Sequence, residues 1–394
     1  MTYLARRIRD VTTTVFAEFS ALAIRHGAVN LGQGFPDFDG PEAIRELAIA
    51  AIRDGLNQYA PSSGLPELKQ AVADHAQRFY RQVVDAATEV AITSGATEGL
   101  LDAILGLVDP GDEVVLFEPY YDSYAANVTM AGGTARYVLL HPPDAGHANW
   151  WFDATELETA FSERTKLVVV NTPHNPTGKV FDRVELEAIA DLCVRHDVIA
   201  LTDEVYEHIV FPPAEHVRLA TLPGMAARTV TLSSAGKSFS CTGWKIGWAI
   251  ANPELLAAVT RVHQFATFAV APAFQRAVAG ALALPDAYFD ELRRSYAARR
   301  DLLLETLHEA ELRPLGPQGS YFAIAQIDGL GFENDVAFCR YLTREVGVAA
   351  IPTSAFYSSE QAVHGSGLVR FAFCKRDQTL LQARDRLRGW ARRR

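Results

Sequence analysis

Short runs of β-branched and aliphatic residues recur through the middle of the chain, and stretches with helical spacing of apolar residues separate them. Several runs are apolar at every position, such as LVVV at 167–170 and VIAL at 198–201. A strand that is apolar on both faces is typical of a parallel sheet with helices on each side. We therefore predict an α/β fold with a large domain built on a mostly parallel, doubly wound central sheet. The expected strands are Val90–Thr93, Glu113–Phe117, Ala135–Leu139, Lys166–Asn171, Val198–Thr202, Thr229–Leu232 and Gly247–Ile250.

The two ends of the chain differ from this middle part. Residues 286–310 have the charge density and period of a long surface helix, and the strand-like runs SYFAIAQI (320–327) and LVRFAFC (368–374) follow. This pattern indicates a smaller α+β domain, with the N-terminal segment packed on it. A chain of 394 residues is long enough for more than one domain. The expected units are an N-terminal arm that belongs partly to the small domain (1–40), a large domain (41–290) and a C-terminal small domain (291–394).

Charge and composition exclude several classes of partner. A formal net charge of −10 argues against nucleic acid or an anionic membrane as the main partner. The sequence contains no run of 18 apolar residues, and Glu18 interrupts the apolar stretch near the N-terminus, so we expect neither a membrane-spanning helix nor a signal peptide. The four cysteines show no CxxC spacing, which argues against a disulfide framework and a metal site. We expect a cytoplasmic protein.

The segments that follow the first predicted strands carry groups that bind ligands. In open parallel sheets, ligands bind beyond the carboxyl ends of the strands. After the first strand, SGATEGL opens a helix whose N–H groups near Gly95, Ala96 and Thr97 suit a phosphate. After the second strand, EPYYDSY offers the flat rings of Tyr120 and Tyr121. Each feature alone has an ordinary structural explanation, but the later strand ends add more such groups.

Three further strand ends supply an amide, an acid with a phenol, and an amine. NTPHNPTG (171–178) is too rich in proline to continue a helix or a strand, TDEVY follows the next strand, and SSAGKSFSCTGWKIGW (233–248) follows the last of the three. Together with a phosphate site and an aromatic platform, these are the groups that would hold a planar, phosphorylated heteroaromatic aldehyde such as pyridoxal 5′-phosphate. The side chains concerned are Asn175, Asp203, Tyr206, Ser234, Lys237 and Lys245.

The presence of lysine in SSAGKSFSCTGWKIGW is informative in itself. Only six of the 37 basic residues are lysines, and two of them, Lys237 and Lys245, lie in this stretch. Arginine binds phosphate as well as lysine does, but a desolvated primary amine can lose its proton and attack a carbonyl. The stretch therefore indicates a need for an amine.

Motifs in fixed order along nearly the whole chain resemble those of fold-type I, class I aminotransferases. Within that group the sequence is similar to the kynurenine, glutamine and methionine aminotransferases, and the N-succinyldiaminopimelate aminotransferases of the same group look much alike. The motifs are VNLGQGFPDF, NQY, EPYYDSY, NTPHNPTGKVF, TDEVYEH, SSAGKSFSCTGWKIGW, VAAIPTSAFYS and LVRFAFCKRD. The resemblance implies a homodimeric transaminase that uses pyridoxal 5′-phosphate in a ping-pong mechanism.

The resemblance also implies roles for residues around the cofactor ring. Lys237 matches the lysine that forms the Schiff base and carries the proton. Asp203 matches the acid that faces the pyridine nitrogen and keeps it protonated. Tyr206 and Asn175 match donors to the 3′-oxygen, and Tyr121 matches the ring that stacks on the pyridine.

Other matches concern the phosphate. Ser234 and Lys245, three residues before and eight residues after the Schiff-base lysine, match phosphate ligands, and the position of Lys245 is commonly arginine in relatives. The backbone amides of Ala96 and Thr97 complete that site. Tyr59 resembles the tyrosine that reaches the phosphate from the other subunit, which implies an active site at the interface of a homodimer.

The implied substrate contacts begin at the α-carboxylate. Arg370 matches the arginine that binds it in a bidentate manner, and Gly34 and Asn175 match groups that contact it as well. We expect an aromatic, sulfur-containing or glutamine-like amino acid. Ala269 and Thr97 stand where relatives that take kynurenine often have histidine and tyrosine. The expected apolar walls are Phe16, Tyr120, Phe268 and Phe356.

Alternative functions remain at this point. The same scaffold supports an N-succinyldiaminopimelate aminotransferase, for which Arg25 or another arginine would have to reach the distal carboxylate, and a cysteine-S-conjugate β-lyase. A nicotinamide dehydrogenase needs a GxGxxG turn after its first strand, and GQGFPDF lacks the third glycine. The histidines show no metal-ligand spacing.

Overall fold

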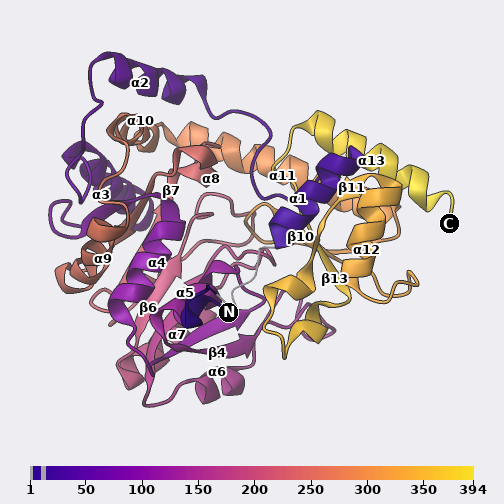
Figure 1. The fold of residues 1–394 in the computed structure, drawn as a ribbon, viewed down its shortest axis with the longest axis horizontal. Helices are drawn as coiled ribbons and strands as arrows, with labels where there is room; N and C mark the ends of the chain where they lie inside the picture. Colours follow the sequence, from indigo (N-terminus) through magenta and orange to yellow (C-terminus); the bar gives the residue numbers. More distant parts are fainter. Residues whose placement is uncertain (1–2, 10–14) are drawn as a thin grey trace.

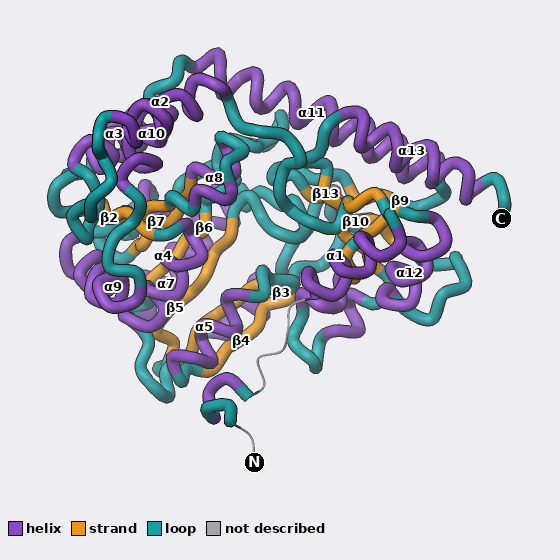
Figure 2. The backbone as a smooth tube through the Cα atoms, turned by 45° about the horizontal axis from the view of Figure 1, so that its top comes forward, coloured by secondary structure: helices purple, strands orange, loops and turns teal. Residues whose placement is uncertain are grey.

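The computed structural model describes residues 3–9 and 15–394, and within them seven strands form one large sheet in the order β2-β8-β7-β6-β5-β3-β4 (Figures 1 and 2). All pairs are parallel except those of β8, which runs antiparallel to β2 and β7. Each predicted strand is confirmed to within two residues at either end. The strands are β2 (Val90–Thr93), β3 (Glu113–Glu118), β4 (Thr134–Leu139), β5 (Thr165–Asn171), β6 (Ile199–Asp203), β7 (Thr229–Ser234) and β8 (Gly247–Ile250).

Helices cover both faces of this sheet, which explains the continuous apolar runs. Leu167 and Val169 of β5 pack on one face in a core with α4 (Gly95–Leu107), α5 (Ser123–Ala131) and α9 (Pro253–Ala266). Val168 and Val170 point to the other face and pack with α6 and α7. Because side chains alternate along a strand, a run such as LVVV is buried on both sides. The helices α6 and α7 span Ala154–Ala160 and Arg183–His196.

A second, smaller part of the molecule contains a four-stranded antiparallel sheet in the order β12-β13-β10-β9. Phe19 and Leu22 of α1 share an apolar core with β10, β13 and α13, so the N-terminal segment packs on the C-terminal part. The division at 1–40, 41–290 and 291–394 stays a prediction, and residues 1–2 and 10–14 of the first unit lie outside the described residues. The strands are β1 (Val29–Asn30), β9 (Arg313–Leu315), β10 (Phe322–Gln326), β11 (Val348–Ala349), β12 (Ile351–Pro352) and β13 (Leu368–Ala372).

The remaining helices connect and flank these two parts, and α11 runs from one to the other (Figure 2). No helix among the described residues is long and apolar enough to cross a membrane. The other α-helices are α1 (Val15–His26), α2 (Glu42–Arg53), α3 (Pro66–Tyr80), α8 (Ala235–Ser238), α10 (Pro272–Leu282), α11 (Asp286–Glu309), α12 (Asp335–Tyr341) and α13 (Asp377–Ala391). Short helical turns lie at Arg6–Ile8, Leu219–Thr221, Thr242–Trp244, Leu342–Val346, Thr353–Phe356 and Ala362–Gly365.

Candidate active site

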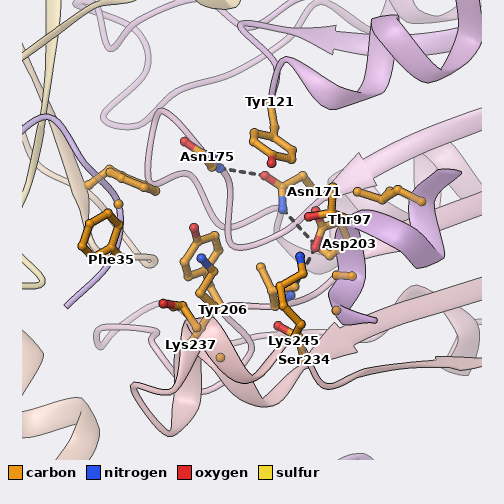
Figure 3. A pocket seen from close by; sticks show the side chains of 18 of the residues that line it. Phe35, Thr97, Tyr121, Asn171, Asn175, Asp203, Tyr206, Ser234, Lys237 and Lys245 are labelled. Atoms are coloured by element: carbon orange, nitrogen blue, oxygen red, sulfur yellow. Dashed lines mark hydrogen bonds between the residues drawn. The ribbon is translucent and has the colours of Figure 1, made fainter. Parts of the chain in front are cut away.

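One pocket lies where the carboxyl ends of β5, β6 and β7 face the smaller sheet, and it encloses about 240 Å³ (Figure 3). Its lining brings together residues that are far apart in the sequence, from the N-terminal arm to β13. Eleven of the twelve positions predicted from the sequence line it. They are Gly34, Ala96, Thr97, Tyr121, Asn175, Asp203, Tyr206, Ser234, Lys237, Lys245 and Arg370.

Lys237 enters the pocket from the short helix α8, which begins directly after β7. Its Nζ lies 5.8 Å from the centre of the Tyr206 ring and 5.7 Å from that of Tyr321. In the described ranges no carboxylate lies within ion-pair distance of this amine. Burial lowers the pKa of Lys237, because the charged form loses hydration that no partner replaces. A neutral, nucleophilic amine is therefore easier to form here than in water.

Asp203 ends β6 and is buried at the opposite side of the pocket from Lys237 (Figure 3). The Tyr124 hydroxyl donates a hydrogen bond of 2.8 Å to its Oδ2. Burial raises the pKa of Asp203, while this hydrogen bond and the charge of Lys237 lower it. The carboxylate is thus held in place and has little solvent around it, as a partner for a protonated ring nitrogen requires.

Tyr124 is a residue that the sequence reasoning missed. It lies in EPYYDSY, in the first turn of α5, whereas Tyr121 stands two residues before that helix; both side chains line the pocket, with ring centres 5.7 Å apart. Its place in the same strand-end motif as Tyr121 could have indicated Tyr124. Asn171 was also missed: its Nδ2 donates to the Asp203 carbonyl at 2.9 Å (Figure 3).

The other end of the pocket is suited to a phosphate. α4 begins here without a side-chain cap, so the N–H groups of its first turn lack partners within the helix. A Cβ atom added to Gly95 would lie 3.0 Å from the Lys245 Nζ, which places the ammonium beside the start of the helix. Lys245 itself adopts a left-handed backbone conformation with φ of 55°. Backbone donors, the Ser234 hydroxyl and a cation together fit a dianion.

Arg370 is fully buried in β13, an interior strand between β12 and β10. Its Nη1 donates to Asn175 Oδ1 and its Nη2 to the Gly32 carbonyl, both at 2.8 Å. The guanidinium carbon lies 4.1 Å from the centre of the Phe322 ring, and no hydrogen-bond acceptor contacts Nε in the described part of the chain. Burial lowers the pKa of Arg370 to about 10. A guanidinium held only by neutral acceptors can bind a carboxylate.

Neighbouring contacts orient the polar groups of the pocket. Because Asn175 Oδ1 accepts from the arginine, its Nδ2 is the atom left to donate toward a ligand. The Asn175 backbone N–H donates to Asn171 Oδ1 at 2.7 Å (Figure 3). Tyr321, which sequence reasoning missed, donates its hydroxyl to the Gly34 carbonyl at 2.5 Å. A Cβ at Gly34 would lie 2.6 Å from the Phe322 ring, so only glycine fits there.

Tyr59 does not line the pocket of its own chain. Its side chain is 83% exposed and contacts Phe268 edge-on, with ring centres 5.3 Å apart. Of the four expected apolar walls only Phe16 lines the pocket, whereas Phe268 is half exposed near Tyr59 and Phe356 packs behind Arg370. Arg25 is exposed on α1.

The family model described as "Aminotransferase class I and II" matches residues 26–387. The probable N-succinyldiaminopimelate aminotransferase of Mycobacterium tuberculosis is 48% identical over 387 residues, which cover 97% of each chain. Mouse kynurenine–oxoglutarate transaminase 3 is 40% identical, with 98% of this chain and 90% of the relative covered. The methionine aminotransferase of Escherichia coli is 39% identical, with 97% of each covered.

Solved structures agree with these sequence matches. The N-succinyldiaminopimelate aminotransferase from Mycobacterium tuberculosis superposes with a TM-score of 0.94 at 47% identity, covering 98% of this chain and all of that one. A methionine aminotransferase from Escherichia coli superposes with a TM-score of 0.93 at 38% identity, covering 99% of this chain and all of that one.

Proposed function

The chain belongs to the class I and II aminotransferases, enzymes that use pyridoxal 5′-phosphate, and from this premise we propose that its amino donor is an L-α-amino acid with an uncharged side chain. Aromatic, sulfur-containing and glutamine-like amino acids fit this description, and a 2-oxo acid receives the amino group. One observation carries the proposal. The described residues that line the pocket include three basic side chains, Lys237, Lys245 and Arg370. Lys237 and Lys245 are assigned to the cofactor, so Arg370 alone is left to bind a negative charge of the substrate.

The cofactor fits the donors of the pocket. Electron withdrawal from the substrate α-carbon is the chemistry that it supplies when bound. We assign its phosphate to Ser234, Lys245 and the amides of Ala96 and Thr97, because these donors converge at the start of α4. Tyr121 provides a flat ring above the site.

Lys237 and Asp203 divide the proton chemistry between them. We assign Lys237 the covalent attachment of the cofactor, since its lowered pKa makes the amine available. With the cofactor bound, the Lys237 Nζ would be the base that takes the proton from the substrate α-carbon and the acid that gives it back. Asp203 holds a proton on the ring nitrogen, and Tyr124 keeps the carboxylate oriented. The hydroxyl of Tyr206 and the Nδ2 of Asn175 would donate to the 3′-oxygen of the cofactor.

The substrate's α-carboxylate is assigned to Arg370. Asn175 Oδ1 and the Gly32 carbonyl accept hydrogen bonds from Nη1 and Nη2 of Arg370, so the guanidinium is oriented before the substrate binds. Beyond it the pocket is lined by the rings of Phe16, Phe35 and Phe322 and by the amide of Gln33. These groups offer apolar contact and one neutral polar partner, which suits an uncharged side chain.

A homodimer with an active site at the subunit interface completes the proposal. Tyr59 and Phe265 are among the most exposed aromatic side chains of the chain, and Phe268 lies beside the first of them. Exposed aromatic rings in one place are typical of an interface. We infer that Tyr59 contacts the cofactor phosphate of the partner subunit. A cytoplasmic location stays a prediction.

A second candidate is the amino donor N-succinyldiaminopimelate. The relative with that printed name is 48% identical over 97% of the chain. This donor carries a distal carboxylate, which would need a cation from the partner subunit, because the described pocket lining offers only the three cations already assigned.

A half-reaction screen decides between the two. Holoenzyme is mixed with one amino acid at a time, namely methionine, glutamine, kynurenine or N-succinyldiaminopimelate, and conversion of the cofactor to its amine form is followed by absorbance. We expect rapid conversion with methionine or glutamine. Conversion by N-succinyldiaminopimelate alone would reject the proposed donor in favour of the second candidate. Release of pyruvate and ammonia from a cysteine S-conjugate would reveal β-elimination.

A further inference from the structure

A second cluster of ionisable groups lies between α4 and α9, behind the proposed phosphate site. Glu98 and Asp102 are four residues apart on α4 and share one face of that helix, and His263 of α9 lies opposite them. Gly106, one turn further along α4, lets α9 approach closely, since a Cβ there would lie 2.5 Å from the Ala258 carbonyl oxygen. This close packing brings the imidazole to the two carboxylates.

The ligand atoms of the three groups converge on one point. His263 Nδ1 lies 3.2 Å from Glu98 Oε1 and 3.8 Å from Asp102 Oδ2. Asp102 and His263 are buried, with 0% and 1% of their surface exposed. Within residues 3–9 and 15–394, both oxygens of Asp102 are buried and have no hydrogen-bond partner. Glu98, Asp102 and His263 each place a ligand atom within 4.8 Å of the other two.

The outer atoms of the same groups are held in place. His263 Nε2 lies 3.0 Å from the Ser62 carbonyl oxygen, which can only accept, so the ring donates from Nε2 and Nδ1 keeps its lone pair in the neutral form. The other oxygen of Glu98, Oε2, accepts a hydrogen bond from the Ser94 backbone N–H. An imidazole whose far nitrogen donates to a carbonyl, beside a carboxylate that is itself hydrogen-bonded, is the arrangement usual around bound metal ions.

Electrostatics calls for a cation in this place. Two buried carboxylates need a compensating charge, and no lysine or arginine in the described part of the chain forms an ion pair with Glu98 or Asp102. The imidazole of His263, 3.2 Å from Glu98 Oε1, is the neighbouring group that can take up a positive charge. A proton on this imidazole is therefore the competitor that a metal ion has to displace.

We propose that Glu98, Asp102 and His263 bind a divalent transition-metal ion of the Zn²⁺ or Mn²⁺ type. Ligand atoms around a tetrahedral ion with bonds of about 2.1 Å lie about 3.4 Å apart, and the two nitrogen–oxygen distances bracket that value. One imidazole and two carboxylates favour these ions over Mg²⁺ and Ca²⁺, which prefer oxygen ligands alone.

The ion would be structural. It would connect Glu98, which binds the backbone at the start of α4, with His263, which binds the loop that carries Tyr59. Both segments belong to the proposed phosphate site, but metal binding itself does not depend on the assigned substrate.

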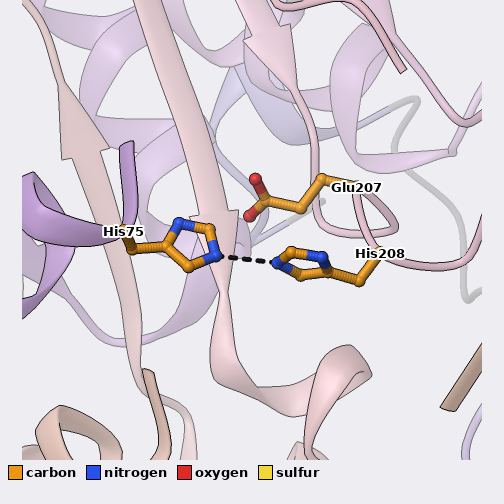
Figure 4. Close-up of side chains that lie close together, drawn as sticks. All are labelled: His75, Glu207 and His208. Carbon is orange, nitrogen blue, oxygen red and sulfur yellow. Dashed lines mark hydrogen bonds between the residues drawn. The ribbon is translucent and has the colours of Figure 1, made fainter. Parts of the chain in front are cut away.

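A second cluster of three ionisable side chains, with two imidazoles and one carboxylate, provides a control. His75, Glu207 and His208 lie equally close together (Figure 4). There the two Nε2 atoms are already paired at 2.7 Å, and Glu207 accepts from Arg218 at 2.8 Å and from Ser233 at 2.6 Å. The ligand atoms are occupied, and the guanidinium would repel a metal ion.

The test uses tag-free holoenzyme dialysed against Zn²⁺ and then against metal-free buffer, with zinc per protomer measured by mass spectrometry. We expect one equivalent in the wild type and in His208→Gln, and at least about a 100-fold loss of affinity in Asp102→Asn and His263→Gln. A parallel dialysis against Mg²⁺ should leave no stoichiometric metal. Chelation of the zinc should lower the thermal midpoint of the wild type but not of Asp102→Asn.

An X-ray absorption spectrum at the zinc edge needs only the wild type, so it decides the matter even where a variant fails to fold. One imidazole with oxygen ligands supports the site, whereas two imidazoles would assign the metal to His75 and His208. Absence of stoichiometric zinc in the wild type, or equal zinc in Asp102→Asn, overturns the proposal and leaves His263 as the charge partner of the carboxylates.

Discussion

The two sides of the segment TDEVYEH (202–208) carry buried charges with opposite surroundings. On the pocket side, Lys237 and Arg370 have no carboxylate within ion-pair distance in the described residues. On the far side, Arg218 donates from Nε to Glu204 at 3.0 Å and from Nη2 to Glu207 at 2.8 Å. All three side chains of this Arg218 cluster are buried.

Paired buried charges such as Arg218 stabilise the fold, whereas unpaired buried charges such as Arg370 are available to bind a ligand. A buried charge that is paired within the protein stabilises one arrangement of the chain. Removing one partner destabilises the fold, because the other charge stays buried without compensation. A buried charge without a partner contributes little to stability, but it can bind an ion of opposite sign. Substitutions on the two sides should therefore affect different quantities.

The largest effect is expected for Lys237→Ala. Turnover should fall by about 10⁴-fold or more, because the attachment point and the proton carrier are lost together. The absorption band of the lysine-bound cofactor should disappear, while the thermal midpoint of the cofactor-free protein stays the same or rises. A large drop in that midpoint would show that the amine stabilises the fold and would break the comparison.

Arg218→Met should affect stability instead. We expect the free energy of unfolding, measured in urea, to fall by about 3–5 kcal/mol, since Glu204 and Glu207 lose their buried partner. Turnover per folded, cofactor-loaded protomer should change little. As a control, Arg195→Met removes an exposed ion pair with Glu158 and should cost less than about 1 kcal/mol.

Arg370→Lys tests the pocket side with a conservative change. A point charge cannot make two parallel hydrogen bonds, so kcat/KM for the amino acid should fall about 100-fold. The urea midpoint should stay close to that of the wild type. An unchanged kcat/KM would show that Arg370 does not bind the substrate α-carboxylate.

The smallest effect is expected for Tyr124→Phe, which acts through Asp203. Burial raises the pKa of Asp203 and the Tyr124 hydroxyl lowers it, so removal of the hydroxyl raises this pKa further. The carboxylate is needed for activity and is lost below its pKa. The acidic limb of the pH–rate profile should therefore move to higher pH, with a loss of about 10-fold at the optimum. A uniform loss without a shift would mean that Tyr124 has only a packing role.

Much of the fold follows from local patterns. The apolar run at 167–170 identifies a strand buried on both faces, and the structure confirms it as β5. Strand-end motifs likewise bring Asn175, Asp203 and Lys237 into one pocket, because the carboxyl ends of parallel strands meet at one edge of the sheet. Tyr321 could not be predicted in this way, since its contact with Gly34 joins positions 287 residues apart.

The sequence by itself determined which segments form strands and which side chains follow each strand end, because strand periodicity and the turn residues after a strand depend on neighbours along the chain. Only the tertiary structure decided which charges are compensated. Glu204 and Glu207 pair with Arg218, whereas Glu98 and Asp102 lie beside the imidazole of His263 and pair with no lysine or arginine within the described ranges. The reason is physical: the energy of a buried charge depends on groups within a few ångströms, and distant parts of the chain supply them.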